Sequence, residues 1–127
     1  MGYDVEFVQI RLSSKVVFPV DAAEGKKLRA RAASFNDPNA VRKALLEIPG
    51  CRPGPGEAID YVGRGLNCAR LSIRQDAIHV ENNCNARELL KLHEVLTRSY
   101  PDLLLVDLQS QQLHSAASFA EWWSRPL

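Results

Sequence analysis

The chain has 127 residues and carries 16 basic and 15 acidic side chains, so its formal net charge is +1. Its 46% hydrophobic and 24% charged residues are ordinary for a globular protein and exclude collagen-like, mucin-like and wholly disordered chains. The length predicts a single domain over residues 1–127, because it is too short for two independent cores. Near-neutrality, and a basic run at Lys26–Arg31 that lacks interleaved aromatic side chains, argue against a nucleic-acid partner.

The cysteines and the apolar runs predict a cellular compartment. Cys51, Cys68 and Cys84 are odd in number and have no CxxC spacing, which favours the reducing cytoplasm over a disulfide framework. The longest apolar run, residues 103–106, is far shorter than the run of about 18 residues that a membrane span needs. We therefore expect a cytoplasmic protein with no membrane partner.

The first strand is predicted over residues 3–12, where apolar and polar side chains alternate. The apolar residues change from odd to even positions between Phe7 and Val8, which indicates either a bulge or a central strand covered on both faces. Residues 16–18 are expected to extend the sheet as far as Pro19.

Two helices are predicted next, each from its capping residues. Asp21 followed by Glu24 three residues later is typical of a helix start, and Asp37 before Pro38 is typical of another. The second helix presents one apolar face, formed by Val41, Ala44, Leu45 and Ile48. Residues 49–56 then contain three prolines and three glycines and are predicted to form a loop.

The second half of the chain begins with a strand over residues 58–62 and a hairpin, whose strands are 69–74 and 77–81. A two-residue turn at Gln75-Asp76 would place Ser72 opposite His79 and Arg70 opposite Glu81. An Arg70–Glu81 ion pair across the strands is expected from that register.

Asn85 and Glu88 predict a further capping box, opening a helix that ends before Pro101. A buried strand over 103–108 follows, and Ser115 begins a short helix that carries Phe119, Trp122 and Trp123. The order βαββαβ plus a terminal helix predicts an α+β fold, specifically a ferredoxin-like split βαβ sandwich. Its helices would pack on one face of an antiparallel sheet and leave the other face open for binding.

The densest polar segment, residues 79–85, contains the only candidate catalytic group: His79, Glu81 and Cys84. A thiol at a helix N-terminus is favoured as the thiolate, and a nearby histidine is a potential base. The alternative is structural, since His79 and Glu81 alternate as the wet face of a hairpin does and Cys84 fills a small apolar gap. No G-x-S-x-G, HExxH or P-loop motif is present to favour catalysis.

Six side chains are possible metal ligands, but none shows the close pairing of a structural zinc site. They are His79, Cys84, His93 and His114, with Glu81 and Asp107 in reserve. His93 is expected to hydrogen-bond at the edge of the core, and His114 to lie in a turn. We predict no metal and no cofactor.

The leading hypothesis is a small non-enzymatic interaction or regulatory module that meets a protein partner or a second copy of itself. One candidate surface is the open sheet face, and the other is the C-terminal helix with Trp122 and Trp123, because tryptophan is enriched at binding hot spots. The competing hypothesis is a small enzyme with the His/Glu/Cys site. The candidate residues of the sheet face are Arg70, Ser72, Arg74, His79 and Glu81.

Overall fold

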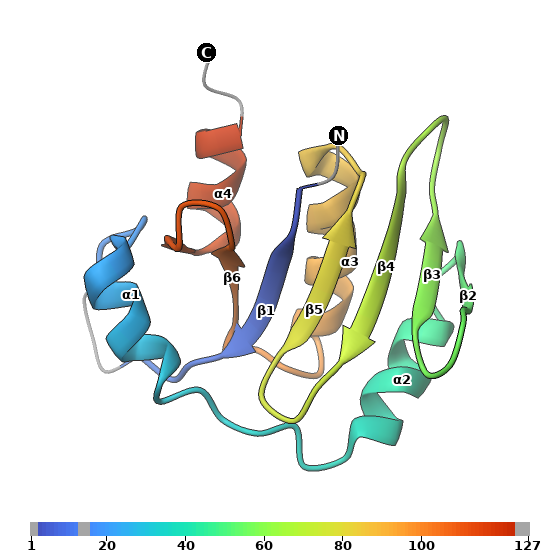
Figure 1. The fold of residues 1–127 in the computed structure, drawn as a ribbon, viewed down its shortest axis with the longest axis horizontal. Helices are drawn as coiled ribbons and strands as arrows, with labels where there is room; N and C mark the ends of the chain where they lie inside the picture. Colours follow the sequence, from blue (N-terminus) through green and yellow to red (C-terminus); the bar gives the residue numbers. More distant parts are fainter. Residues whose placement is uncertain (1–2, 13–15, 124–127) are drawn as a thin grey trace.

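The computed structural model describes residues 3–12 and 16–123. These form a seven-stranded sheet in the order β2-β3-β4-β5-β1-β6-β7, with every neighbouring pair antiparallel. The strands are β1 (Val5–Gln9), β2 (Cys51–Pro53), β3 (Ile59–Val62), β4 (Cys68–Ile73), β5 (Ile78–Asn82), β6 (Leu103–Asp107) and β7 (Leu113–His114). The helices are α1 (Ala22–Arg29), α2 (Pro38–Leu46), α3 (Ala86–Thr97) and α4 (Ala116–Trp123) (Figure 1).

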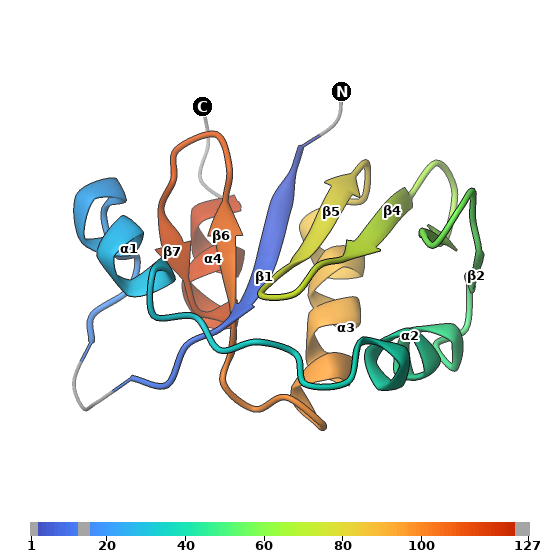
Figure 2. The same ribbon diagram turned by 60° about the horizontal axis from the view of Figure 1, so that its bottom comes forward.

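The α+β class and the antiparallel sheet are confirmed, but the sheet is wider than the expected sandwich. Residues 51–53, predicted as loop, form the edge strand β2 and pair with β3. Residues 16–18 do not extend the sheet; instead Val20 makes a single bridge to Leu113. The helices also do not all lie on one face, because Leu28 of α1 packs against a separate cluster on the opposite side of the sheet (Figure 2).

The local signals for helix starts and for the hairpin are confirmed. The side chains of Asp21, Asp37 and Asn85 each accept hydrogen bonds from backbone N–H groups in the first turn of their helices. The Arg74 N–H donates to the Ala77 carbonyl at 2.8 Å, which closes the predicted two-residue turn. Ser72 accordingly lies opposite His79, and Arg70 lies opposite Glu81.

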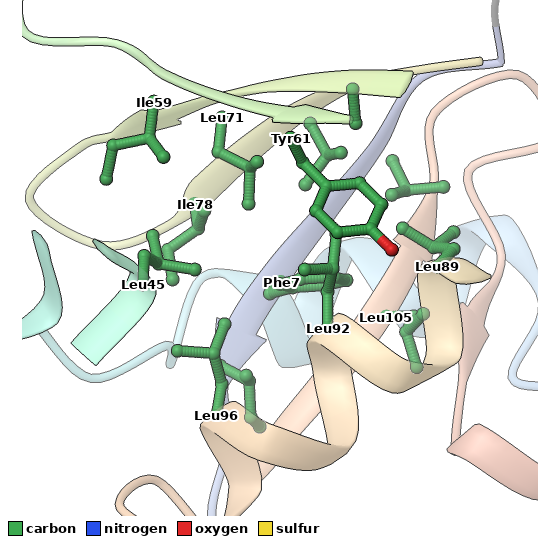
Figure 3. Close-up of a cluster of buried hydrophobic side chains, with 14 of the residues drawn as sticks. Phe7, Leu45, Ile59, Tyr61, Leu71, Ile78, Leu89, Leu92, Leu96 and Leu105 are labelled. Carbon is green, nitrogen blue, oxygen red and sulfur yellow. The ribbon is translucent and has the colours of Figure 1, made fainter. Parts of the chain in front are cut away.

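The main core lies between one face of the sheet and helices α2, α3 and α4 (Figure 3). Strand β1 contributes Val5 and Phe7, while α2 and α3 contribute Leu45 and Leu92; all four are 0–1% exposed. Burial of side chains of this size stabilises the fold by roughly 1.5–3 kcal/mol each. The core side chains of β3, β4 and β5 therefore point in a fixed direction. Because side chains alternate along a strand, the remaining side chains of these strands point to the opposite face.

Strand β1 is buried on both faces, which is one of the two alternatives that the sequence left open for it. Val5 and Phe7 enter the main core, whereas Val8 and Ile10 enter a second cluster with Val106 and Leu113. The register with β6 runs from Val5–Asp107 to Gln9–Leu103 without interruption, so no bulge is needed. The strand is therefore central and covered on both sides.

Two buried histidines are held in their neutral forms. His93 Nε2 lies 2.8 Å from the Leu103 carbonyl oxygen, and burial lowers the pKa of His93. His114, expected in a turn, is instead fully buried in β7, where Nδ1 lies 3.0 Å from Ser118 Oγ. Burial also lowers the pKa of His114, against a weaker opposing effect of Asp107.

Because the pKa values of these two histidines are lowered in the folded protein, we predict that it loses stability in mild acid. The unfolded chain takes up protons at its imidazoles below about pH 6.5, and the folded chain does so only at lower pH, so the free energy of unfolding should fall as the pH drops through that value. A His93→Gln variant keeps an N–H donor for the Leu103 carbonyl but does not titrate. Urea unfolding between pH 7.5 and 5.5 should show a smaller pH dependence for this variant; an unchanged dependence would contradict the assignment to His93.

Candidate functional site

One face of strands β2–β5 is not covered by any helix of the described residues. Figure 1 looks onto this side, with α3 behind β4 and β5. Side chains alternate along each strand, so residues such as Asp60, Arg70 and His79 point away from the main core. We call this surface the open face. A shallow groove of about 460 Å³ runs over it.

Four charges of alternating sign cross the open face. Arg52 on β2 is the cross-strand partner of Asp60 on β3, Asp60 is the partner of Arg70 on β4, and Arg70 is the partner of Glu81 on β5. We call these four residues the charge row. They all line the groove. Neighbouring positions in such a row are separated by one strand spacing, about 4.8 Å.

The ion pair of Arg70 differs from the one expected. Its Nε and Nη2 donate to the two carboxylate oxygens of Asp60 at 2.8 and 3.2 Å, rather than to Glu81. This two-pronged hydrogen bond lowers the pKa of Asp60 and raises that of Arg70. Glu81 is exposed and has no ion pair within 4.0 Å among the described residues.

His79 lies between two carboxylates at the β1 side of the open face. Its Nε2 is 3.5 Å from Asp4 Oδ2, and its Nδ1 is 3.5 Å from Glu6 Oε2. Glu6 is buried and also accepts a hydrogen bond from Arg29 of α1 at 2.7 Å, with Arg74 at 3.7 Å. The carboxylate of Glu6 therefore links α1 to the hairpin, and the imidazole of His79 lies beside it.

The structure does not bring Cys84 to His79 and Glu81. Cys84 is 5% exposed and belongs to the main core, whereas His79 and Glu81 point to the open face. Its N–H donates to the Asn82 side chain at 3.0 Å, and Asn82 is itself fully buried. Burial raises the pKa of Cys84 to about 12, so the thiolate expected at this helix N-terminus is not favoured.

The three thiols should therefore differ in reactivity. Cys68 is exposed, Cys51 is half-buried with its pKa raised by burial to about 11, and Cys84 is buried. Because the thiolate is the reacting form, an aromatic disulfide reagent added to dilute protein at pH 8 should label Cys68 fast, Cys51 slowly and Cys84 only on unfolding. Rapid labelling of native Cys84, identified by peptide mass, would contradict this placement.

Both tryptophans of the C-terminal helix pack on their own chain. The rings of Trp122 and Trp123 lie 5.5 and 4.9 Å from the ring of Tyr3, and both lie within 5.7 Å of Phe119. They are half-buried against the main core. Much of their apolar surface is thus used inside the protein, with Tyr3 as a partner that the sequence did not indicate.

Glu88 fastens the loop between β3 and β4 to helix α3. Its carboxylate is 6% exposed and accepts hydrogen bonds from the Tyr61 hydroxyl and the Arg64 N–H, both at 3.2 Å, with Lys91 Nζ at 3.5 Å. The Arg64 N–H contributes most to lowering the pKa of Glu88. The second half of the predicted capping box is absent, because the Asn85 N–H donates to the Asn67 side chain instead. The hydrogen bonds of Glu88 therefore hold the β3–β4 loop at the edge of the open face.

Gly63 is required at this contact. A Cβ on Gly63 would overlap Glu88 Oε1 and lie 2.9 Å from the Tyr61 hydroxyl. Gly63→Ala should therefore lower the free energy of unfolding by about 1–3 kcal/mol. In a Glu88→Ala background the same substitution should lower the free energy of unfolding by clearly less, because the carboxylate that the new Cβ would overlap is absent. Chemical unfolding of the unsubstituted protein, the two single variants and the double variant measures this coupling. An equal loss of unfolding free energy in both backgrounds would show that Glu88 is not the group that excludes a side chain at Gly63.

Other classes of site are not apparent in the part of the chain that the structure describes. No group of three or more His, Cys, Asp or Glu side chains there is arranged to hold a metal ion. None of the helices within residues 3–12 and 16–123 has the length and apolar character needed to cross a bilayer. Comparison with protein families, with curated proteins and with solved structures finds no match.

Sequence reasoning located part of the open face. It singled out Arg70, Ser72, Arg74, His79 and Glu81, and all five lie on the strands or turn of the β4–β5 hairpin. It missed Asp60, Arg52 and Glu6, which approach from β3, β2 and β1. Asp60 alternates with apolar residues in the predicted strand 58–62, which indicated that its side chain points away from the core. The sequence did not indicate which strand lies next to β3, so it did not indicate the partner of Asp60.

Proposed function

We propose that this protein is a non-enzymatic interaction module that docks another protein chain on the open face. The observation that carries the proposal is the charge row, which crosses four adjacent strands on a face that no described helix covers. Charges arranged in a fixed pattern on a surface give specificity and register to a protein interface. The groove between them gives a partner side chain room to enter.

Rigidity of the open face supports the proposal. Directly behind the charge row, Ile59, Leu71 and Val80 are fully buried in the main core. The β3–β4 loop beside it is held by Glu88, and Arg70 is already oriented by Asp60. A surface that is ordered before binding loses little conformational entropy when a partner docks.

The open face is a better candidate than the C-terminal helix, because Trp122 and Trp123 are already packed against Tyr3 and Phe119. Its mixture of both signs also suits a protein partner better than a polyanion, which selects uncompensated positive charge. The His/Glu/Cys enzyme has no comparable support, since Cys84 lies in the core.

Two finer interpretations accompany this proposal. The inner strands follow the order β4-β5-β1-β6, and we interpret the fold as a ferredoxin-like sheet extended by β3 and β2 on one edge and by β7 on the other. We place the protein in the cytoplasm, where its three free cysteines would stay reduced.

Photo-crosslinking tests the proposed docking surface. The photo-reactive amino acid p-benzoylphenylalanine replaces Val62, which is 47% exposed on the open face and lies outside the charge row, or Glu47, which is exposed at the end of α2 on the other side of the sheet. Irradiation of cells that produce the protein should give a discrete adduct from position 62 and none from position 47. No adduct from position 62, or equal adducts from both, would refute docking on the open face.

A further inference from the structure

We infer that the partner of the open face is a second copy of this chain, which docks face to face across a two-fold axis. This inference rests on the proposed function and names its partner. Homodimers of this kind use one surface twice, so the surface must be complementary to itself. The charge row meets that requirement.

The order of signs in the charge row carries the argument. Read from β2 to β5 the signs are plus, minus, plus, minus, for Arg52, Asp60, Arg70 and Glu81. A two-fold axis parallel to the strands, passing between β3 and β4, reverses this order in the second copy. Arg52 then faces Glu81, and Asp60 faces Arg70, so that every position meets the opposite sign. A row that carried one sign only, or that had the same sign at both ends, would place like charges opposite each other, which disfavours association.

The inner and outer charges have different roles in this arrangement. Asp60 and Arg70 are already paired within each chain, and in the dimer the two pairs stack with opposite orientation. Arg52 and Glu81 have no ion pair within 4.0 Å among the described residues. Both are exposed, and each gains a direct ion pair only on docking. They therefore decide whether the second copy binds.

A neighbouring row supplies apolar contact near the same axis. Val62 on β3 is 47% exposed, and its cross-strand partner is the exposed Cys68 on β4. The two-fold axis places Val62 of one copy over Cys68 of the other. Burial of these side chains favours docking, because exposed valine loses contact with water. Both residues line the groove beside the charge row.

Charge reversal at the outer positions tests the inference on the purified chain. The unsubstituted protein should sediment as a dimer of twice the 14.2 kDa chain mass, in equilibrium with monomer. Arg52→Glu alone and Glu81→Arg alone each create a like-charge contact and should weaken dimerisation at least about tenfold. Glu47→Arg, on the other side of the sheet, is the matched control and should not change it. The double variant R52E/E81R should dimerise again.

Mixing the two single variants gives the sharpest result. In the mixed pair, residue 52 of the R52E chain faces residue 81 of the E81R chain with opposite sign, and the reciprocal contact is also complementary. An equimolar mixture should therefore form heterodimers although neither variant dimerises well alone. This rescue cannot arise from damage to the fold of either variant, which circular dichroism would check separately.

The outcomes separate this inference from the proposed function. A chain that remains monomeric at all concentrations up to about 1 mM refutes the second copy as the partner. A dimer that both single variants leave intact refutes this axis. In either case a crosslinked adduct at position 62 that contains a different protein would leave the proposed docking surface standing, whereas no adduct would remove both.

Discussion

Strand β1 has to bury apolar side chains on both of its faces, and the rest of the architecture follows from this requirement. Val5 and Phe7 need helices α2, α3 and α4 on one side, while Val8 and Ile10 need α1, Val20 and Leu113 on the other. The second cover lies over β1, β6 and β7 and reaches the β4–β5 hairpin only at its turn, at Ala77. The outward face of β3, β4 and β5 therefore remains available for polar side chains.

The polar side chains of this face are organised by the strand register rather than by loops. Each strand from β2 to β5 contributes one member of the charge row, and the buried residues behind them fix their positions. Exposed ion pairs add little to stability, typically less than about 1 kcal/mol. The pattern therefore adds little to the stability of the fold, which is consistent with the docking function that we propose for it.

Burial and hydrogen bonding together decide which titratable side chains are charged. Cys84 follows β5 on the core side, and desolvation raises the pKa of its thiol. Glu88 shows the opposite result, because hydrogen bonds from Arg64 and Tyr61 favour its charged form despite the low exposure of its side chain. Hydrogen-bond donors, rather than burial alone, determine which of these groups carries charge.

The sequence by itself determined the features that depend on neighbouring residues: the helix starts at Asp21, Asp37 and Asn85 and the tight turn after Arg74. For β1 it left a bulge and burial on both faces as alternatives. Capping and hairpin register act over a few residues, so their signals are local. Only the tertiary structure decided which strands became neighbours, because pairings such as β2 with β3 and β1 with β5 depend on how the whole chain closes around its core. Those pairings give Arg70 its partner Asp60, direct Glu88 to Tyr61 instead of its own cap, and assemble the charge row from four strands.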